Sequence, residues 1–181
     1  MFFFLFQKSY LNIFRFNNNN FLILLFPEHV YKFMFSALTE AEKALELDEI
    51  PVGAVVVHSN RIIGRAYNQV ELLKDPTAHA EMIAITSASN HLKTKFLDDC
   101  DIYVTIEPCV MCAGAILLSR FRNVYFGTFE PKFGAAGSLY NLLEDSKYNH
   151  TLKVFSGVYA EESKNLIQNY FRKKRNIKNL N

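Results

Sequence analysis

One stretch of the sequence marks the passage from a β-strand into a helix. Residues 105–115 read Thr105-Ile106-Glu107-Pro108-Cys109-Val110-Met111-Cys112-Ala113-Gly114-Ala115. Residues 101–106 have strand character, and residues 109–120 favour a helix. In a helix, cysteines at i and i+3 lie on one face, and near its N-terminus the free N–H groups and the dipole favour thiolates. The spacing of Cys109 and Cys112 therefore suits a metal ion.

A second stretch lies earlier in the chain and reads Asp75-Pro76-Thr77-Ala78-His79-Ala80-Glu81. Asp is a favoured N-cap and Pro is favoured at the first helical position, so we predict that a helix begins at Asp75 and Pro76 and runs toward His91. Residues at i and i+2 point about 200° apart in a regular helix interior. His79 and Glu81 can therefore share a site only near the start of that helix.

Together the two stretches read H-x-E…P-C-x-x-C. Zinc prefers thiolate sulfur and imidazole nitrogen, and a catalytic zinc site keeps three protein ligands with a fourth position open. We predict that His79, Cys109 and Cys112 bind one Zn²⁺ per chain. A lone C-x-x-C can instead be a redox pair or two core cysteines, and a lone His is more often structural. The joint pattern outweighs these alternatives, and Cys100, which fits no ligand spacing, is predicted to be a small core residue.

Glu81 is predicted to be the catalytic acid and base. Zinc lowers the pKa of a bound water toward neutrality, so that hydroxide becomes available to an amidine-like ring carbon, whereas the departing amine needs a proton. A carboxylate at Glu81 can take a proton from the water and deliver it first to the ring nitrogen and then to the leaving ammonia. The pattern thus indicates hydrolysis of a C–N bond in a cyclic amidine.

From Glu28 onward strands alternate with helices, which predicts an α/β fold: a mixed sheet of about five strands with helices on both faces. The expected helices are residues 30–47, 75–91, 109–120 and 161–175, and the expected strands are residues 52–57, 61–66, 101–106, 123–128 and 153–157. Strands 52–57 and 61–66 read as an antiparallel hairpin. The chain has the length of one domain, residues 28–181, preceded by an extension, residues 1–27.

The extension differs in composition, with a Phe-rich start, an Asn run and a short apolar run closed by Pro27. Its apolar runs are too short to span a bilayer, so no membrane partner is expected. Lys8 and Arg15 without any acid are weakly typical of an organellar transit peptide, although Arg and Ser are few. We expect a dispensable or mis-started extension and a cytoplasmic protein, with an organellar location as the alternative.

Composition narrows the remaining classes of function. The 20 Lys and Arg against 18 Asp and Glu give a net charge of +2, so the overall charge of the chain does not indicate a nucleic-acid partner. Three cysteines with one tight pair argue against a secreted disulfide framework and favour a reducing compartment. A local cluster of basic residues does occur near the C-terminus, within residues 169–175. There Arg172 can neutralise phosphates and Phe171 can stack on an unstacked base, or the cluster is a solvated helix end.

At four separated places the sequence resembles the cytidine and deoxycytidylate deaminase superfamily, and more closely the TadA-type tRNA adenosine deaminases. The matching segments are PVGAV (51–55), DPTAHAE (75–81), TIEPCVMCAGA (105–115) and GAAGS (134–138). That superfamily carries an H-x-E…P-C-x-x-C signature, which this sequence matches. The resemblance spans about residues 28–175 and implies the three-layer α/β/α cytidine-deaminase-like fold. Residues 1–27 have no counterpart in it.

The resemblance also implies residue roles. It makes His79, Cys109 and Cys112 zinc ligands, Glu81 the proton shuttle and Asn68 a contact to the base edge, although a turn-forming Asn is the alternative. It places Ala54 at the substrate and residues 129–138, with Lys132, at the entrance of the pocket. Family members commonly have Asp where Glu130 stands, and Phe129 and Phe133 are unexpected, so the contacts of this loop with an anticodon remain open.

The resemblance implies hydrolytic deamination of adenosine to inosine at the wobble position of a tRNA, whose anticodon loop offers a base that can be splayed into a pocket. The first alternative is a deaminase of a free nucleobase or nucleotide: guanine, cytosine or dCMP. A second is a zinc module without turnover, but Glu81 and the missing fourth ligand argue against it. The family further implies a homodimer, for which Ala113, Gly114 and Ala115 would suit close helix packing.

Overall fold

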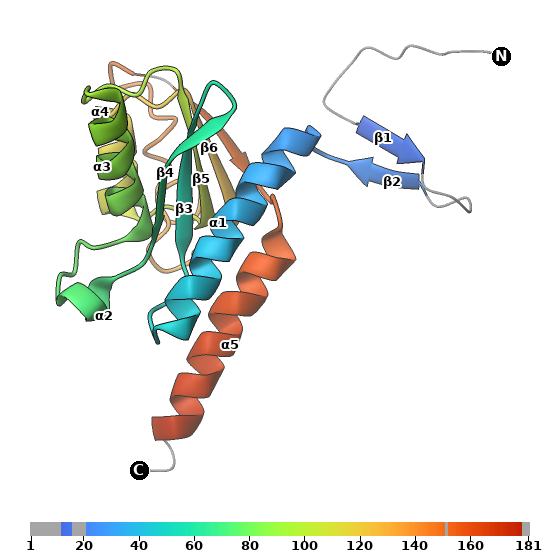
Figure 1. The fold of residues 1–181 in the computed structure, drawn as a ribbon, viewed down its shortest axis with the longest axis vertical. Helices are drawn as coiled ribbons and strands as arrows, with labels where there is room; N and C mark the ends of the chain where they lie inside the picture. The colour runs from blue at the N-terminus through green and yellow to red at the C-terminus, as the bar shows by residue number, and fades with distance from the viewer. Residues whose placement is uncertain (1–11, 16–20, 151, 179–181) are drawn as a thin grey trace.

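The computed structural model describes residues 12–15, 21–150 and 152–178, and its main body is a five-stranded sheet covered by helices on both faces (Figure 1). The strand order is β4-β3-β5-β6-β7. These strands are β3 (Gly53–His58), β4 (Arg61–Tyr67), β5 (Cys100–Ile106), β6 (Asn123–Thr128) and β7 (Lys153–Ser156). The first pairs, β3 with β4 and β3 with β5, are antiparallel, and β5, β6 and β7 are parallel. The mixed five-stranded α/β fold predicted from the sequence is therefore confirmed.

Helices α3 (Ala80–Leu92) and α4 (Val110–Leu118) lie on one face of the sheet, and α1 (Glu28–Glu46) and α5 (Ala160–Lys178) on the other (Figure 1). The alternation along β3 produces this division, because successive side chains of a strand point to opposite faces. Ala54 and Val56 join the core beneath α3 and α4, whereas Val55 and Val57 join the core beneath α1. The result is the predicted three-layer α/β/α arrangement.

Close approach of α1 to the sheet explains one residue of the PVGAV segment. A Cβ atom on Gly53 would collide with the Ala37 carbonyl oxygen and the Ala41 nitrogen of α1. The Gly53 N–H is also fixed, since it donates to Thr105 Oγ1 at 3.1 Å on the neighbouring strand. Only glycine lets the helix lie this close to β3.

Two features of the fold differ from the sequence prediction. A short helix, α2 (Val70–Leu73), follows β4, where no helix was expected. The predicted helix 75–91 starts later than expected, because Asp75 forms a turn in which its Oδ1 accepts from the Thr77 N–H at 2.8 Å and the Thr77 hydroxyl at 2.7 Å. Asp75 thus caps a turn, and the helix itself begins at Ala80.

The extension was predicted to be residues 1–27, and residues 1–11 and 16–20 of it lie outside the described residues. Within it, β1 (Asn12–Arg15) and β2 (Phe21–Leu24) pair antiparallel as a separate two-stranded sheet. Among the residues that the structure describes, no helix combines the length and apolar character needed to cross a bilayer. The role of the extension remains a prediction.

Candidate metal centre and active site

The start of α3 presents His79 and Glu81 to one place. His79 is the N-cap of this helix, with extended backbone angles (φ −72°, ψ 151°), and its side chain makes no capping hydrogen bond. Because His79 lies outside the regular helix, the wide angle between residues i and i+2 of a helix interior does not separate it from Glu81. The sequence prediction placed the helix start wrongly at Asp75. Its conclusion that His79 and Glu81 must lie near the start of the helix in order to share a site nevertheless holds, because His79 is the N-cap.

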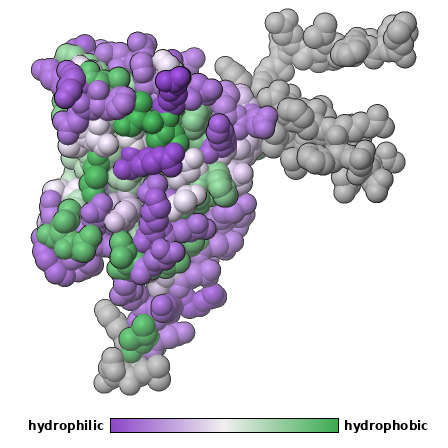
Figure 2. Space-filling view, viewed as in Figure 1, coloured by the Kyte–Doolittle hydropathy of each residue, from purple (hydrophilic) through white to green (hydrophobic). Residues whose placement is uncertain are grey.

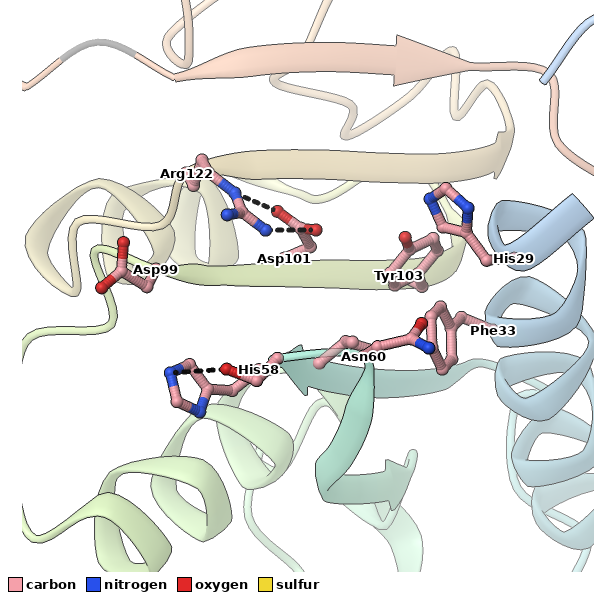
Figure 3. A pocket seen from close by; sticks show the side chains of 10 residues that line it. His29, Phe33, His58, Asn60, Asp99, Asp101, Tyr103 and Arg122 are labelled. Atoms are coloured by element: carbon pink, nitrogen blue, oxygen red, sulfur yellow. Dashed lines mark hydrogen bonds and ion pairs between the residues drawn. The ribbon is translucent and has the colours of Figure 1, made fainter. Parts of the chain in front are cut away.

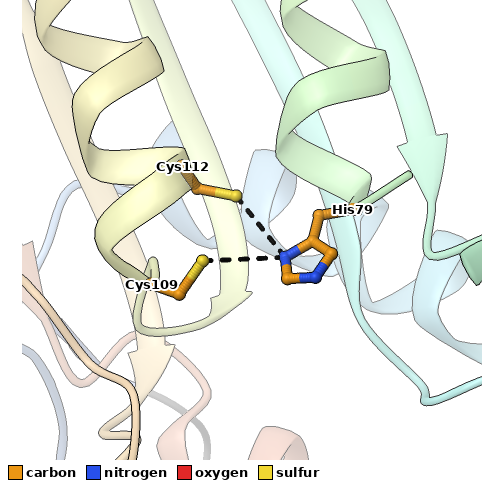
Figure 4. A group of neighbouring side chains, drawn as sticks. All are labelled: His79, Cys109 and Cys112. Carbon is orange, nitrogen blue, oxygen red and sulfur yellow. Dashed lines mark hydrogen bonds between the residues drawn. The ribbon is translucent and has the colours of Figure 1, made fainter. Parts of the chain in front are cut away.

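The start of α4 is built in the same way. Cys109 is its N-cap, again in extended conformation and without a side-chain capping bond, and Cys112 lies in the first turn. Cys109 follows the end of β5 through Glu107 and Pro108, so the strand aims the helix start at the site. In Figure 4 both sulfur atoms point toward the same ring nitrogen of His79.

The geometry of this group fits zinc. His79 Nδ1 lies 3.7 Å from Cys109 Sγ and 3.6 Å from Cys112 Sγ. Zn–N bonds of ~2.05 Å and Zn–S bonds of ~2.3 Å at a tetrahedral angle require an N···S separation of about 3.6 Å. One potential ligand atom from each of the three residues lies within 4.8 Å of the other two. The donor set and its spacing are therefore those of a three-ligand catalytic zinc site.

Hydrogen bonding within the cluster makes the two thiols differ in acidity. The Cys112 thiol donates toward the Cys109 sulfur, which lowers the pKa of Cys109 to about 4 and raises the pKa of Cys112. The interaction with Cys109 also raises the pKa of His79. Zinc binds thiolates and neutral imidazole, so metal uptake releases protons from the group.

Glu81 is enclosed beside these ligands. The residue is 3% exposed, and this burial raises the pKa of its carboxyl group, while the nearby His79 opposes the shift. A carboxyl group with a raised pKa can both accept and return a proton near neutral pH. When bound, zinc supplies activation of the attacking water. Glu81 is placed to move the protons that hydrolysis of the C–N bond requires.

Asn68 follows β4 directly, and Ala54 lies on the side of the sheet that α3 and α4 cover. Asn68 is 5% exposed, and its Nδ2 donates to Glu49 Oε2 at 3.0 Å. The next residue, Gln69, donates its N–H to the carbonyl of Ala78, directly before His79, at 2.9 Å. Ala54 is fully buried on β3, in the core beneath α3. Gln69 thus ties the chain that follows Asn68 to the segment that carries His79. The substrate contacts of Asn68 and Ala54 remain predictions.

The loop after β6 is fastened to the zinc site by Glu107. This carboxylate is buried and accepts from the N–H groups of Glu130 at 3.0 Å, Ala136 at 2.9 Å and Ser138 at 2.9 Å, and also from the Ser138 hydroxyl. A Cβ atom on Gly134 would collide with the same carboxylate. Glu107 therefore sets the path of residues 130–138 beside Cys109.

The outer side of this loop is exposed. Lys132 is exposed, and its N–H donates to Glu130 Oε1 at 2.9 Å. Phe129 and Phe133, whose presence was unexpected, are 52% and 68% exposed. Lys132 thus lies between two exposed aromatic residues in the sequence, close to residues that Glu107 anchors.

Helix α5 runs toward the same end of the molecule as the C-terminus of α1 (Figure 1), and the surface at this end is mostly hydrophilic in the same view (Figure 2). Tyr170 is buried and donates its hydroxyl to the Asp48 carbonyl at 3.1 Å, whereas Phe171 is 40% exposed. Arg172 is exposed and donates to Asn169 Oδ1 at 2.7 Å. Of the two aromatic residues that the sequence offered for base stacking, Tyr170 packs the helix and Phe171 stays accessible.

A cavity of about 370 Å³ lies away from the metal group, at the opposite end of the sheet (Figure 3). It is lined by the β3–β4 turn, by residues at the starts of β5 and β6, and by His29 and Phe33 of α1. Its Arg122 and Asp101 pair through two hydrogen bonds of 3.0 and 2.9 Å, so the charges largely satisfy one another. It brings none of the predicted site residues together.

Sequence reasoning gave no role to Glu107 or to Glu49. Both are buried carboxylates that accept hydrogen bonds from backbone or side-chain donors of neighbouring loops. The sequence offered one local indication that these acids matter. Each lies one or two residues before a proline at a junction between a helix and a strand, in Glu107-Pro108 and Glu49-Ile50-Pro51. Acids are rarely buried without partners.

The prediction that Cys100 is a core residue is confirmed, and burial raises its pKa to about 11.

Comparison with known proteins agrees with this site. A tRNA-specific adenosine deaminase of Aquifex aeolicus is 46% identical over 144 residues, which are 80% of this chain and 95% of that protein. A tRNA-specific adenosine deaminase of Haemophilus influenzae is 47% identical over 150 residues, 82% of this chain and 87% of that protein.

Solved structures show the same fold. One, from a study of A-to-I editing by tRNA:A34 deaminases at the wobble position of transfer RNA, matches with a TM-score of 0.72 and 42% identity over 75% of this chain and 98% of the other. A guanine deaminase from Nitrosomonas europaea matches with a TM-score of 0.69 at 23% identity, over 77% of this chain and 83% of the other, which bears on the fold alone.

The profile of the cytidine and deoxycytidylate deaminase zinc-binding region matches residues 27–128. That range contains His79, Glu81, Cys109 and Cys112, the residues that the fold brings together. The chain therefore belongs to the cytidine and deoxycytidylate deaminase family and is a zinc-dependent deaminase.

Proposed function

We propose that this protein hydrolyses adenosine to inosine at the wobble position of a tRNA. The observation that carries the proposal is the convergence of His79, Cys109 and Cys112 with the buried Glu81 at the starts of α3 and α4, in a chain whose similar curated relatives are tRNA-specific adenosine deaminases. His79, Cys109 and Cys112 would hold a zinc ion that activates water, and Glu81 would move the protons, so the site offers both requirements of a hydrolytic deamination.

Exposed aromatic and basic residues favour an RNA substrate over a small free base. Exposed Phe129, Lys132 and Phe133 follow β6, and exposed Phe171 and Arg172 lie on α5. Single-stranded RNA is recognised by aromatic rings that stack on unpaired bases and by cations that meet phosphates. These contacts suit an anticodon loop from which one adenosine has been splayed into the site.

The function is tested with zinc-loaded protein and two kinds of substrate. A tRNA carrying adenosine at the wobble position is incubated beside free guanine, cytosine and dCMP, and inosine formation is measured by sequencing while ammonia release is measured in every arm. We expect inosine at the wobble position and no conversion of the free compounds. Deamination of a free base without reaction of the tRNA would replace our proposal with the small-molecule alternative.

We also propose that the protein acts as a homodimer through α4. Leu118 is 80% exposed on this helix, Val110 is also exposed, and a Cβ atom on Gly114 would have open space around it. Ala113, which we had grouped with Gly114 and Ala115 as a packing surface, is buried in the core of its own chain. An apolar cavity of about 460 Å³ lined by Gly114, Leu117 and Leu118 adjoins this face and suits a second copy.

The dimer is tested by sedimentation of the wild type and of Leu118→Lys. We expect a dimer for the wild type and a shift toward monomer for the variant, because the lysine charge would be buried at the interface. A wild-type protein that stays monomeric at micromolar concentration contradicts this part of the proposal. Arg61→Gln, on the β3–β4 hairpin, is the control.

We further propose a cytoplasmic location, which the three free cysteines support because ligand thiols must stay reduced. Mass spectrometry of the mature N-terminus provides the test. An intact extension agrees with the proposal, whereas removal of about residues 1–27 in cells would favour import into an organelle.

A further inference from the structure

A buried acid beside the site takes no part in the chemistry described so far. Glu49 follows α1 and is 1% exposed. Its backbone N–H donates to the Ala44 carbonyl at 2.9 Å, which ties it to the end of that helix. Its two carboxylate oxygens each accept one hydrogen bond: Oε2 from Asn68 Nδ2 at 3.0 Å and Oε1 from the Leu72 N–H of α2 at 2.6 Å.

These two bonds decide which way the Asn68 amide faces. An ionised carboxylate only accepts hydrogen bonds, so Asn68 must turn its nitrogen toward Glu49. Asn68 Oδ1 has no hydrogen-bond partner among the residues that the structure describes, yet it is not among their fully buried, unpartnered atoms. The oxygen and the second amide N–H are therefore left for another molecule.

Glu49 is itself held rigidly. The preceding residue, Asp48, accepts from the Tyr170 hydroxyl at 3.1 Å through its carbonyl and from Lys174 Nζ at 2.5 Å through its carboxylate. The turn 48–49 is thus fastened to α5 on one side and to Asn68 and α2 on the other. Preorganised polar groups lose less free energy when they engage a substrate than groups that must first be ordered.

We propose that Glu49 is a positioning residue for the reaction: it locks the Asn68 amide in one orientation and so fixes the hydrogen-bonding pattern offered to the substrate. The inference rests on the proposed function. Its consequence is that Glu49 acts through Asn68, since Glu49 itself is enclosed and its two oxygens are already occupied by protein donors.

Glu49→Gln is the informative substitution because it keeps the shape and removes one acceptor. Its amide nitrogen must face either Asn68, which then turns its oxygen inward, or the Leu72 N–H, which then loses its partner. We expect kcat/KM on wobble-adenosine tRNA to fall about 10-fold or more, with zinc content unchanged. Glu40→Gln is the matched control, since Glu40, which lies on α1, is also a buried acid but pairs with Lys43 and Arg65.

A double-mutant cycle with Asn68→Ala tests whether Glu49 acts through Asn68. We expect Glu49→Gln to change kcat/KM less than about 2-fold once Asn68 is already alanine. Equal factors in both backgrounds, or no effect of Glu49→Gln in the wild type, would overturn the inference. If Glu49→Gln does not fold, the same cycle is run with Glu49→Asp, whose shorter side chain cannot span both donors.

A measurement without substrate separates this inference from the proposed function. The side-chain amide resonances of Asn68, assigned by their loss in Asn68→Ala, are compared between the wild type, Glu49→Gln and Glu40→Gln. We expect a shift in Glu49→Gln alone, and an unshifted signal overturns the contact. A shift found in a protein that leaves tRNA unmodified would support the contact and contradict only the proposed function.

Discussion

At the scale of single residues, Glu81 should separate catalysis from metal binding. Its carboxyl group is buried beside the zinc ligands but is not needed to complete them. We predict that Glu81→Ala keeps about one zinc per chain and loses turnover by roughly 10² to 10⁴-fold, the range for a general acid or base. Elemental analysis and single-turnover rates measure the two quantities. Exposed Glu42→Ala is the control, and a Glu81→Ala rate above about a tenth of wild type would contradict the assignment.

The three cysteines provide a second residue-scale prediction. Cys109 and Cys112 meet His79 at the starts of their helices, whereas Cys100 is buried at the start of β5 within the core. We predict that Cys109→Ala and Cys112→Ala each lose zinc and that Cys100→Ala retains it. Metal content of the purified variants decides the matter. The ligand set would be wrong if Cys100→Ala lost its zinc while remaining folded.

At the scale of elements, the sequence predicted the residues of the metal group better than it predicted the start of α3. Capping rules favoured Asp75 as a helix N-cap, but its side chain instead bonds Thr77 two residues on, a competing turn available to Asp. The predicted placement of the C-x-x-C pair is correct because Cys109 is the N-cap of α4 and Cys112 lies in its first turn. The role of Glu107 could not be predicted, because its partners in residues 130–138 are distant in sequence and meet it only in the folded chain.

The loop 130–138 should depend on Glu107. Each carboxylate oxygen of Glu107 accepts hydrogen bonds from two donors, and in Glu107→Gln an amide nitrogen replaces one of these oxygens. Each donor that loses its acceptor costs about 1 to 3 kcal/mol. We predict a loss of roughly 2 to 6 kcal/mol in the free energy of unfolding, which lowers Tm by about 5 to 20 °C for a domain of this size. Thermal melting measures this change.

Hydrogen exchange should report where the Glu107→Gln change acts. Faster exchange is expected at the Ala136 and Ser138 amides, which donate to Glu107. Glu130→Gln is the matched control because the Glu130 side chain accepts from only the Lys132 N–H in the same loop. Similar melting temperatures for the two variants would show that Glu107 does not hold the loop.

At the scale of the whole molecule, α5 divides its basic residues between structure and surface. From Glu28 on, 18 positive charges face 18 negative ones, so the cluster at residues 172–175 is a local excess within a neutral domain. Lys174 is already engaged by Asp48, and its amine lies 5.4 Å from the centre of the Tyr170 ring. Within the described part of the chain, Lys173 and Arg175 form no ion pair. Lys173 and Arg175 are thus the charges most available to phosphates.

We therefore predict that Lys173→Gln with Arg175→Gln weakens tRNA binding and flattens its salt dependence, because each neutralised phosphate contributes roughly 0.7 to 0.9 to the slope of log K against log salt. The slope should decrease by about 1.5, and by more when Arg172 and Lys174 are also replaced, with zinc content and fold intact. Titrations against tRNA at several salt concentrations measure it. Arg61→Gln with Lys153→Gln removes the same charge at the opposite end of the sheet and should leave the slope nearly unchanged. If both double variants shift the slope equally, net charge alone steers the tRNA; if neither does, the cluster is a solvated helix end.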